Sequence, residues 1–217
     1  MQIFRLVLAL VLSGVVAYLI GSVNFAIIVT RIFAHEDIRK YGSGNAGMTN
    51  VLRTLGKGPA ALVTIGDFCK GALAVLISYL LLRTVGGTEP PFYTNYVVAV
   101  MVLLGHCFPV FYGFRGGKGI LVSAGVILVL NPLILLALLA IFLVVVIASR
   151  IVSLASITVA VAYPILTLIF GLVGQDPYLL WDVLVALCVG GAVVWMHRAN
   201  IRRLIDGTEH KFGQKKS

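Results

Sequence analysis

Charged side chains are scarce in this sequence. Its 217 residues include 17 lysines and arginines and eight aspartates and glutamates, so that only 12% are charged and 60% are hydrophobic. Soluble domains have about 25% charged and about 45–50% apolar residues. With a mean hydropathy of +1.05, the composition excludes a soluble enzyme and a disordered tail, and it indicates a membrane protein.

Acidic residues and cysteines are also few, and neither type forms a cluster. The eight carboxylates are scattered, so we expect no metal site and no metal-dependent phosphoalcohol transfer. Cys69, Cys107 and Cys188 form no Cys-x-x-Cys pair and are expected to fill the core. A Gly-x-Ser-x-Gly elbow is absent as well, which argues against a covalent acyl-enzyme.

Long apolar runs, in contrast, make up most of the chain. Charge-free stretches cover 6–30, 90–114, 119–149 and 151–175, and each exceeds the roughly 20 residues that a membrane helix needs. They are continuously apolar rather than alternating, which favours helices over a barrel. We therefore predict an all-α integral membrane protein, a single multi-pass domain over 1–217 whose first run is a retained span. The seven predicted spans are 4–30, 59–82, 92–114, 117–131, 132–149, 151–173 and 178–197.

The basic residues predict the orientation of these spans. With seven spans, one set of alternate loops holds 14 of the 17 basic residues, whereas the opposite side keeps only Arg5 and Arg83, and Lys70 lies within the second span. The positive-inside rule then puts the N-terminus outside and the C-terminus in the cytoplasm. Asn131-Pro132 is read as a turn, although a kink there would leave six spans. The net charge of +9 is assigned to this topology and not to a nucleic-acid partner.

The polar segment His35–Arg53 lies between the first two predicted spans. Its glycines spell G-x-G-x-x-G, but a dinucleotide fingerprint needs a surrounding βαβ unit, which this sequence lacks. Glycines do allow a close backbone approach to a ligand, amides at a helix start bind anions, and Arg53 offers a planar fork for phosphate. An ordinary polar connector is the alternative. The candidate phosphate-binding residues here are Ser43, Gly44, Asn45, Gly47, Thr49 and Asn50.

The second polar segment, Gly105–Gly119, places glycines around Lys118 before another predicted helix. It lacks the spacing and the Ser or Thr of an ATP-binding P-loop. A positively charged stop at the membrane face would explain Arg115 and Lys118 but not the glycines. We therefore predict a second phosphate site made of Arg115, Gly116, Gly117, Lys118 and Gly119.

Three further places hold polar residues inside or beside apolar runs. Asp67 and Lys70 lie three residues apart on one face of the second predicted span, where an ion pair that positions a loop and a direct ligand are equally compatible with the spacing. Ser153 lies three residues after Arg150, although small hydroxyl residues also pack helices in membranes. His197 and Asn200 share a helix face at the end of the last span, which favours a role in chemistry over an interfacial one. His106 is a weaker candidate.

Together these segments resemble a known family, the bacterial acylphosphate-dependent glycerol-3-phosphate acyltransferases, or PlsY family. The resemblance rests on Gly-Ser-Gly-Asn-Ala-Gly-Met-Thr-Asn-Val-Leu-Arg at 42–53, Asp-Phe-Cys-Lys-Gly at 67–71, Gly-His-Cys-Phe-Pro-Val-Phe at 105–111, Arg-Gly-Gly-Lys-Gly at 115–119 and His-Arg-Ala-Asn-Ile-Arg-Arg-Leu-Ile-Asp-Gly-Thr-Glu at 197–209. Two departures are Arg115, where the family usually has lysine, and Met48, where a small residue is common.

The resemblance implies transfer of a fatty acyl group from acyl phosphate to the sn-1 hydroxyl of glycerol-3-phosphate at the inner face of the cell membrane. Lysophosphatidic acid and phosphate would be the products, with no metal, cofactor or obligatory protein partner. It implies that Ser43, Arg53, Lys118, Ser153 and Asn200 hold phosphate groups and that His197 lies at the reacting centre. Supporting roles are expected for Asp67, Lys70, His106, Arg203 and Glu209.

The residue chemistry agrees with such a reaction because both substrates are phosphorylated and acyl phosphate is already activated. The alternative from another class is a small transporter or lipid flippase with a cytoplasmic anion site. Transporters usually have internal repeats and sites near the membrane midplane, whereas these motifs collect at one predicted face. A purely structural membrane subunit would not need His197, Asn200 and the glycines around Lys118 together.

Overall fold

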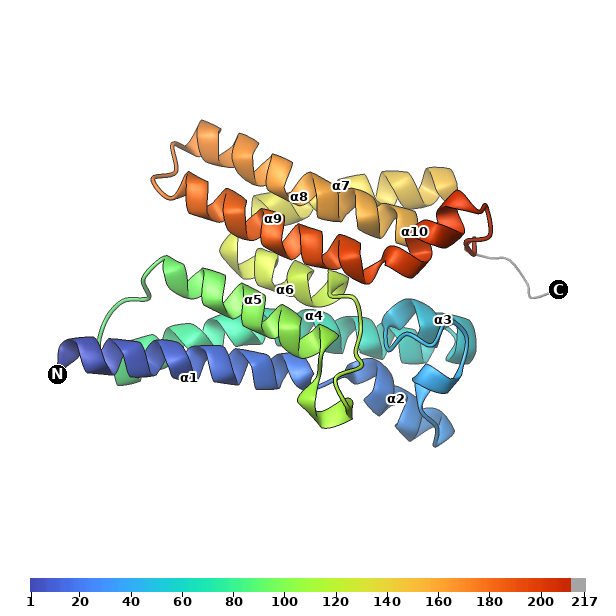
Figure 1. The fold of residues 1–217 in the computed structure, drawn as a ribbon, viewed down its shortest axis with the longest axis horizontal. Helices are drawn as coiled ribbons and strands as arrows, with labels where there is room; N and C mark the ends of the chain where they lie inside the picture. Colours follow the sequence, from blue (N-terminus) through green and yellow to red (C-terminus); the bar gives the residue numbers. More distant parts are fainter. Residues whose placement is uncertain (212–217) are drawn as a thin grey trace. The chain divides into compact units, whose positions relative to one another are not determined.

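The computed structural model describes residues 1–211, and every regular element in that range is helical. The chain divides into two compact units, Met1–Leu130 and Asn131–Ser217. Figure 1 shows the helices of each unit. The two units are described separately below.

The first unit is built on three long helices, α1 (Gln2–Ser22), α4 (Lys57–Leu81) and α5 (Tyr93–Cys107). They pack against one another, and α6 (Ile120–Leu130) packs against α4. The shorter helices of this unit are α2 (Phe25–Ala34), η1 (Ile38–Lys40), α3 (Met48–Leu55), η2 (Leu82–Gly86) and η3 (Val110–Tyr112).

The first predicted span, 4–30, contains a helix break. Val23 and Asn24 have extended backbones between α1 and α2, and the Asn24 side chain accepts a hydrogen bond from the Ile27 amide as the N-cap of α2. A run of apolar residues alone does not show such a break, because both helices have apolar faces. The buried face of α2 includes Ile27 and packs in one cluster with residues of η1, α3 and α4, such as Ile38 and Val51.

Glycines bring the helices of the first unit into backbone contact. A Cβ atom added to Gly21 would overlap the carbonyl oxygen of Val102, and one added to Gly105 would overlap that of Tyr18, so α1 and α5 approach closely. Gly71 and Gly125 have the same relation to the backbones of α6 and α4. Small residues permit this packing in membrane helices, where the surrounding lipid is as apolar as the side chains.

The second unit contains α7 (Pro132–Ser149), α8 (Val152–Gly174), α9 (Leu179–Met196) and α10 (Arg198–Ile205). Helix α8 packs against both α7 and α9, and α10 follows α9 directly. Gly190 of α9 lies against the Ala160 carbonyl of α8, where a Cβ atom would overlap it.

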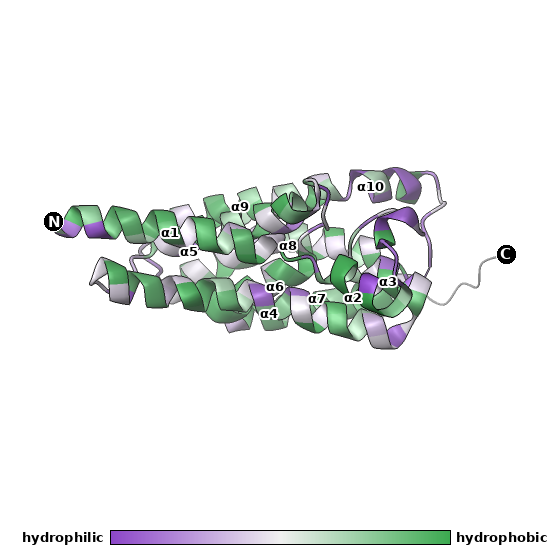
Figure 2. Ribbon diagram, turned by 90° about the horizontal axis from the view of Figure 1, so that it is seen from below, coloured by the Kyte–Doolittle hydropathy of each residue, from purple (hydrophilic) through white to green (hydrophobic). Residues whose placement is uncertain are grey.

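Six segments within residues 1–211 are long and apolar enough to cross a membrane, and α6 is a shorter apolar helix. Asn131 has a non-helical backbone and its side chain caps α7, which begins at Pro132. The helix is therefore interrupted at Asn131, and residues 119–149 do not form one continuous helix. Most residues of α1, α4 and α5 are hydrophobic, whereas hydrophilic residues are concentrated at α10 and around α3 (Figure 2).

The expectation that all three cysteines fill the core is wrong for two of them. Cys107 is buried, but Cys69 and Cys188 are exposed. Each exposed cysteine lies on a long apolar helix, α4 or α9. An apolar environment suits cysteine on a lipid-facing surface as well as in a core, and so hydropathy alone does not distinguish the two.

Adding one methyl group to α4 tests this close packing. Gly71→Ala should lower the free energy of unfolding by about 1–3 kcal/mol, because the Val122 carbonyl leaves no room for it. Gly58→Ala in the same helix is the matched control, since nothing lies near its Cβ position, and it should be neutral or stabilising. Thermal unfolding in detergent measures both, and a Gly71→Ala protein at least as stable as Gly58→Ala would contradict the packing.

Candidate functional site: two glycine loops and a carboxylate cluster

The side chain of Asn50 organises the loop before α3. Its amide nitrogen lies within hydrogen-bond distance of the carbonyls of Ile38, Tyr41 and Asn45, at 3.2, 2.9 and 3.1 Å, and its oxygen accepts the Ser43 amide at 3.0 Å. Asn50 is buried. These contacts fold the segment 38–47 around one residue and leave the Ser43 side chain on the surface.

Glycines are required in this loop by its backbone. Gly42 and Gly44 have φ angles of +57° and +71°, and a Cβ at Gly42 would overlap the Asn50 side-chain oxygen. Gly47 has an extended backbone and stands as the N-cap of α3, followed by Met48 and Thr49. The loop therefore leads into a helix start, which is the arrangement that the sequence predicts for anion binding.

The second loop, 108–119, is closed at its base by backbone hydrogen bonds. The Gly116 amide donates to the Cys107 carbonyl at 3.0 Å, and the Gly117 amide donates to the His106 carbonyl at 3.1 Å. These two amides are thus engaged within the protein. The sequence prediction counted these amides as donors to an anion. The structure explains the glycines by lack of space instead, because a Cβ on Gly116 would overlap the His106 carbonyl and one on Gly117 would overlap the His106 ring.

A buried polar cluster lies beside this second loop. The ammonium group of Lys70 is 2.7 Å from Asp67 Oδ1 and 2.9 Å from His106 Nδ1, and it donates to the Val23 carbonyl at 2.6 Å. Asp67, Lys70 and His106 are all buried. Of the two readings that the sequence left open, the structure favours a positioning role, because Lys70 reaches the break between α1 and α2 and the end of α5 at once.

The two loops of the first unit meet at Gly117. A Cβ on this residue would overlap His106 Nε2 and would lie 2.9 Å from the Ala46 carbonyl. The Ala46 carbonyl in turn accepts a hydrogen bond from the Asn24 side chain at 3.3 Å. The cluster around Lys70, the helix break and both glycine loops are thus in contact.

The predicted cations of the first unit lie in the second loop and in the helix that follows the first loop. Lys118 and Gly119 follow directly after Gly117, before α6 begins at Ile120. Arg53 is an exposed residue in the last turn of α3, and Arg115 is exposed at the far side of the second loop. The first loop therefore contacts the second at Ala46 and Gly117, directly before Lys118, whereas Arg53 lies further along the chain, in the last turn of α3.

The second unit has a carboxylate cluster centred on Glu209. Its Oε1 accepts hydrogen bonds from Ser153 Oγ and Asn200 Nδ2, each at 2.8 Å, and its Oε2 accepts one from Arg203 Nε at 2.6 Å. Glu209 is buried. The carboxylate thus joins the start of α8 to α10, and it holds two residues, Ser153 and Asn200, that the resemblance assigns to phosphate binding.

These donors lower the pKa of Glu209. Burial alone would raise the pKa of this carboxyl group, but the hydrogen bonds from Asn200, Arg203 and Ser153 outweigh burial and bring the pKa below its usual value of 4.5. Glu209 is therefore ionised near neutral pH. Within residues 1–211, the structure brings together no group of three or more side chains suited to hold a metal ion.

His197 lies at the junction of α9 and α10 and is 3% exposed. Its Nδ1 is 2.8 Å from the Val193 carbonyl. Because a carbonyl can only accept, this contact assigns the proton of a neutral ring to Nδ1 and makes Nε2 the basic nitrogen. Asn200, three residues on, is also buried.

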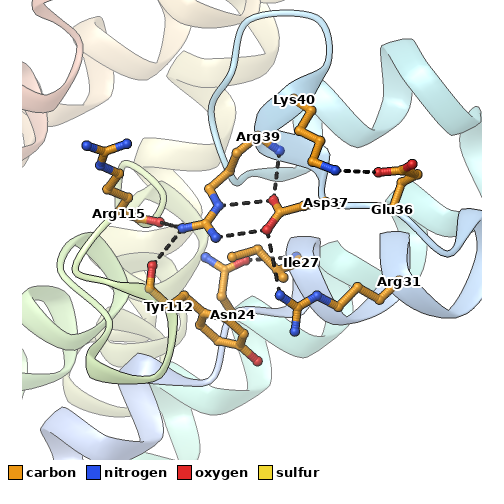
Figure 3. A network of polar contacts seen from close by, with 9 residues as sticks. All are labelled: Asn24, Ile27, Arg31, Glu36, Asp37, Arg39, Lys40, Tyr112 and Arg115. Carbon is orange, nitrogen blue, oxygen red and sulfur yellow. Dashed lines mark hydrogen bonds and ion pairs between the residues drawn. The ribbon is translucent and has the colours of Figure 1, made fainter.

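Sequence reasoning missed Asn24, Asp37 and Arg39. Asn24 caps α2 and binds the Ala46 carbonyl, and an Asn just before an apolar helical run is a signal that could have identified the cap. Asp37 and Arg39 form a network that extends to the second loop (Figure 3). No local pattern reveals that contact, since Arg39 and Tyr112 are 73 residues apart.

Acid should weaken the second unit through Glu209. A carboxyl group with a lowered pKa stabilises the fold above its ordinary pKa, and this contribution is lost as the pH falls through the lowered value. Glu209→Gln should therefore reduce the free energy of unfolding by about 1.5–3 kcal/mol at pH 7, and the difference from wild type should shrink below pH 4.5. Unfolding midpoints measured from pH 7 downward test this.

Glu36→Gln is the matched control, because Glu36 forms an ion pair with Lys40 in which both side chains are exposed. It should leave the unfolding midpoint nearly unchanged at every pH. A Glu209→Gln protein as stable as Glu36→Gln at pH 7 would refute the structural importance of the cluster.

Comparison with known proteins identifies the family. The family model described as glycerol-3-phosphate acyltransferase matches residues 11–207. Glycerol-3-phosphate acyltransferases from Clostridioides difficile and Thioalkalivibrio sulfidiphilus are 44% and 45% identical over 206 and 199 residues, covering 95% and 92% of this chain and 97% and 92% of theirs.

Solved structures agree with the sequence matches. A crystal structure of PlsY (YgiH), an integral membrane glycerol 3-phosphate acyltransferase in its glycerol 3-phosphate form, superposes with a TM-score of 0.80 at 34% identity and covers 94% of this chain and 96% of its own. The lysophosphatidic acid form gives a TM-score of 0.77 at 33% identity, with 94% and 95% coverage. With its apolar helices and its glycine loops, the chain therefore belongs to the glycerol-3-phosphate acyltransferase family of integral membrane proteins.

Proposed function

We propose that this protein transfers a fatty acyl group from acyl phosphate to the sn-1 hydroxyl of glycerol-3-phosphate. The observation that carries the proposal is the contact between two glycine loops, each followed by a helix start. The second loop carries Lys118, and Arg53 lies in the last turn of the helix that follows the first loop. The solved relatives bear glycerol 3-phosphate or lysophosphatidic acid in their named forms. A substrate and a donor that both carry phosphate suit two loops of this kind.

The proposed reaction needs no covalent intermediate on the protein. The hydroxyl oxygen of glycerol-3-phosphate attacks the acyl carbonyl carbon, and a new ester bond forms. The bond between that carbon and the phosphate oxygen breaks, and its electron pair leaves with inorganic phosphate. The hydroxyl proton passes to a base. The enzyme's work is then orientation, stabilisation of developing charge and proton removal.

Arg53 and Lys118 are the residues proposed to balance the phosphate charge. Arginine offers a planar pair of donors to phosphate, whereas lysine acts as a point charge. The amides of Gly116 and Gly117 have internal partners, so we assign phosphate contacts in the second loop to Lys118 and the start of α6. Binding contacts are also proposed for Ser43, Gly44, Asn45, Gly47, Thr49, Arg115, Gly119 and Ser153, whereas Asn50 is proposed to hold the first loop in shape through its own hydrogen bonds.

His197 is proposed as the base, with the substrate's own phosphate as the alternative acceptor. The contact of Nδ1 with Val193 makes Nε2 the nitrogen that can accept a proton. Asn200 is proposed to position a substrate, and its own position is fixed by Glu209. Arg203 and Glu209 thereby support the reaction through Asn200 and Ser153.

We further propose the cell inner membrane as the location, with seven spans, the N-terminus outside and the active site facing the cytoplasm. The basic loops support this orientation through the positive-inside rule. The acyl chain would enter from the bilayer, and no cofactor or obligatory protein partner is needed.

Turnover in a defined membrane tests the function. Purified protein in nanodiscs, given palmitoyl phosphate and glycerol-3-phosphate, should release inorganic phosphate and lysophosphatidic acid in equal amounts. Lys118→Ala should lower kcat/KM by about 100-fold or more, because a charge at the leaving phosphate is lost. Lys40→Ala is the control, since Lys40 is exposed and pairs with Glu36, and it should retain wild-type turnover.

Parallel reactions with acyl carrier protein and coenzyme A thioesters test the donor. Turnover with a thioester but not with palmitoyl phosphate would reject the acyl-phosphate donor while keeping the acyltransferase. Equal activity of Lys118→Ala and Lys40→Ala would remove Lys118 from the phosphate site.

A further inference from the structure

Arg39 connects the two glycine loops through its guanidinium group. Two of its nitrogens face one carboxylate: Nε is 3.0 Å from Asp37 Oδ1 and Nη2 is 2.8 Å from Asp37 Oδ2. The remaining nitrogen, Nη1, donates to the carbonyls of Tyr112 at 2.7 Å and Arg115 at 3.1 Å. Figure 3 shows the guanidinium group between Asp37 on one side and these carbonyls on the other.

The two carbonyls that Arg39 binds stand on either side of an unusual turn. Gly113 and Phe114 lie between them, with φ angles of +66° and +58°. A bulky residue such as Phe114 rarely adopts a left-handed backbone unless its surroundings hold it there. The Phe114 amide donates to the Pro109 carbonyl, and Arg39 supplies the contacts on the carbonyl side. Arg115 and the glycines around Lys118 follow this turn directly.

Asp37 orients the guanidinium group of Arg39. Its Oδ1 also accepts the Arg39 amide at 3.0 Å, which fixes Asp37 at the start of η1. The hydrogen bonds from Arg39 lower the pKa of Asp37, so this carboxylate is ionised near neutral pH. With Nε and Nη2 bound to Asp37, Nη1 is left pointing at the second loop.

We propose that Arg39 is a positioning residue that couples the two glycine loops, holding the Gly113–Phe114 turn so that Arg115 to Gly119 are preorganised for a phosphorylated substrate. This inference rests on the proposed function for the identity of the substrate. The geometry requires a planar group with several fixed donors, which lysine lacks even though it keeps the charge. Binding of a preorganised loop is tighter because less order has to be imposed on it.

The test compares Arg39→Lys with Arg31→Lys in nanodiscs. Arg31 is the matched control because it belongs to the same network through longer contacts, 3.7 Å from Asp37 and 5.6 Å from the centre of the Tyr112 ring, and its side chain is 57% exposed. Arg39→Lys should raise the KM of at least one phosphorylated substrate by about tenfold and lower kcat by less than about threefold. Arg31→Lys should keep both constants within about twofold of wild type.

A second readout does not depend on turnover. Trypsin should cut after Arg115, an exposed residue, several-fold faster in Arg39→Lys than in Arg31→Lys, with the fragments identified by mass spectrometry. This comparison decides whether Arg39 orders the second loop, even if the wild-type protein transfers no acyl group. Such a lack of turnover would reject only the proposed function. If Arg39→Lys does not fold, Asp37→Asn is the milder variant, and it should shift both readouts in the same direction.

Two results would overturn the proposal. Wild-type kinetics and cleavage in Arg39→Lys would show that positive charge alone suffices at this position. Faster cleavage with unchanged KM values would show that Arg39 orders the second loop but does not contribute to substrate binding.

Discussion

The ammonium group of Lys70 is held inside a helical unit by three acceptors: the Asp67 carboxylate, the His106 ring and the Val23 carbonyl. The arrangement combines an ion pair with Asp67 and hydrogen-bond contacts with His106 and Val23. The acceptors come from three places that the chain must bring together, namely α4 itself, the end of α5 and the break between α1 and α2. That junction contacts the first glycine loop at Ala46 and the second at Gly117.

Because Asp67 and Lys70 are buried, each charge depends on its partner. An unpaired charge inside a membrane protein is unfavourable by several kcal/mol, and removing one partner of a buried ion pair typically destabilises a protein by about 3–5 kcal/mol. Asp67 and Lys70 are 1% and 3% exposed, so neither can exchange its partner for water. His106 is fixed by Lys70 on one ring nitrogen, and its other nitrogen lies where only a glycine at 117 leaves room. A buried charge thereby determines the shape of a loop that carries Lys118.

Much of the fold follows from the sequence, because the constraints on a membrane helix are local. Continuous apolar runs predicted the long helices, and the proline after a polar residue at Asn131-Pro132 predicted the boundary. The structure shows why the boundary lies there, since Asn131 caps α7 and Pro132 is its first residue. The break at Val23–Asn24 was not predicted, because apolar residues lie on both sides of it. The bounds of the short helices α3 and α10 were not predicted either, because both helices are polar and hydropathy does not distinguish a polar helix from a loop.

The candidate site was predictable as a set of residues but not as a set of contacts. Glycine and cation spacing identified the segments 42–53 and 115–119, and the spacing of Asp67 and Lys70 indicated a pair on one helix face. Which amides remain for a ligand could not be read from the sequence, since Gly116 and Gly117 donate to the carbonyls of Cys107 and His106, at the end of the preceding helix. Long-range contacts such as that of Arg39 with Tyr112 depend on the fold itself.

Amide hydrogen exchange in an Asp67→Leu/Lys70→Met protein tests the central interaction most directly. This double variant replaces the ion pair by apolar side chains and leaves no buried charge unpaired, so the helices should still fold. Without Lys70, the account predicts faster exchange at 22–26 and at 105–119, including the Gly116 and Gly117 amides, with no change in α8 and α9. Wild-type exchange in the 105–119 segment of the folded variant would show that the Lys70 cluster does not hold the glycine loop.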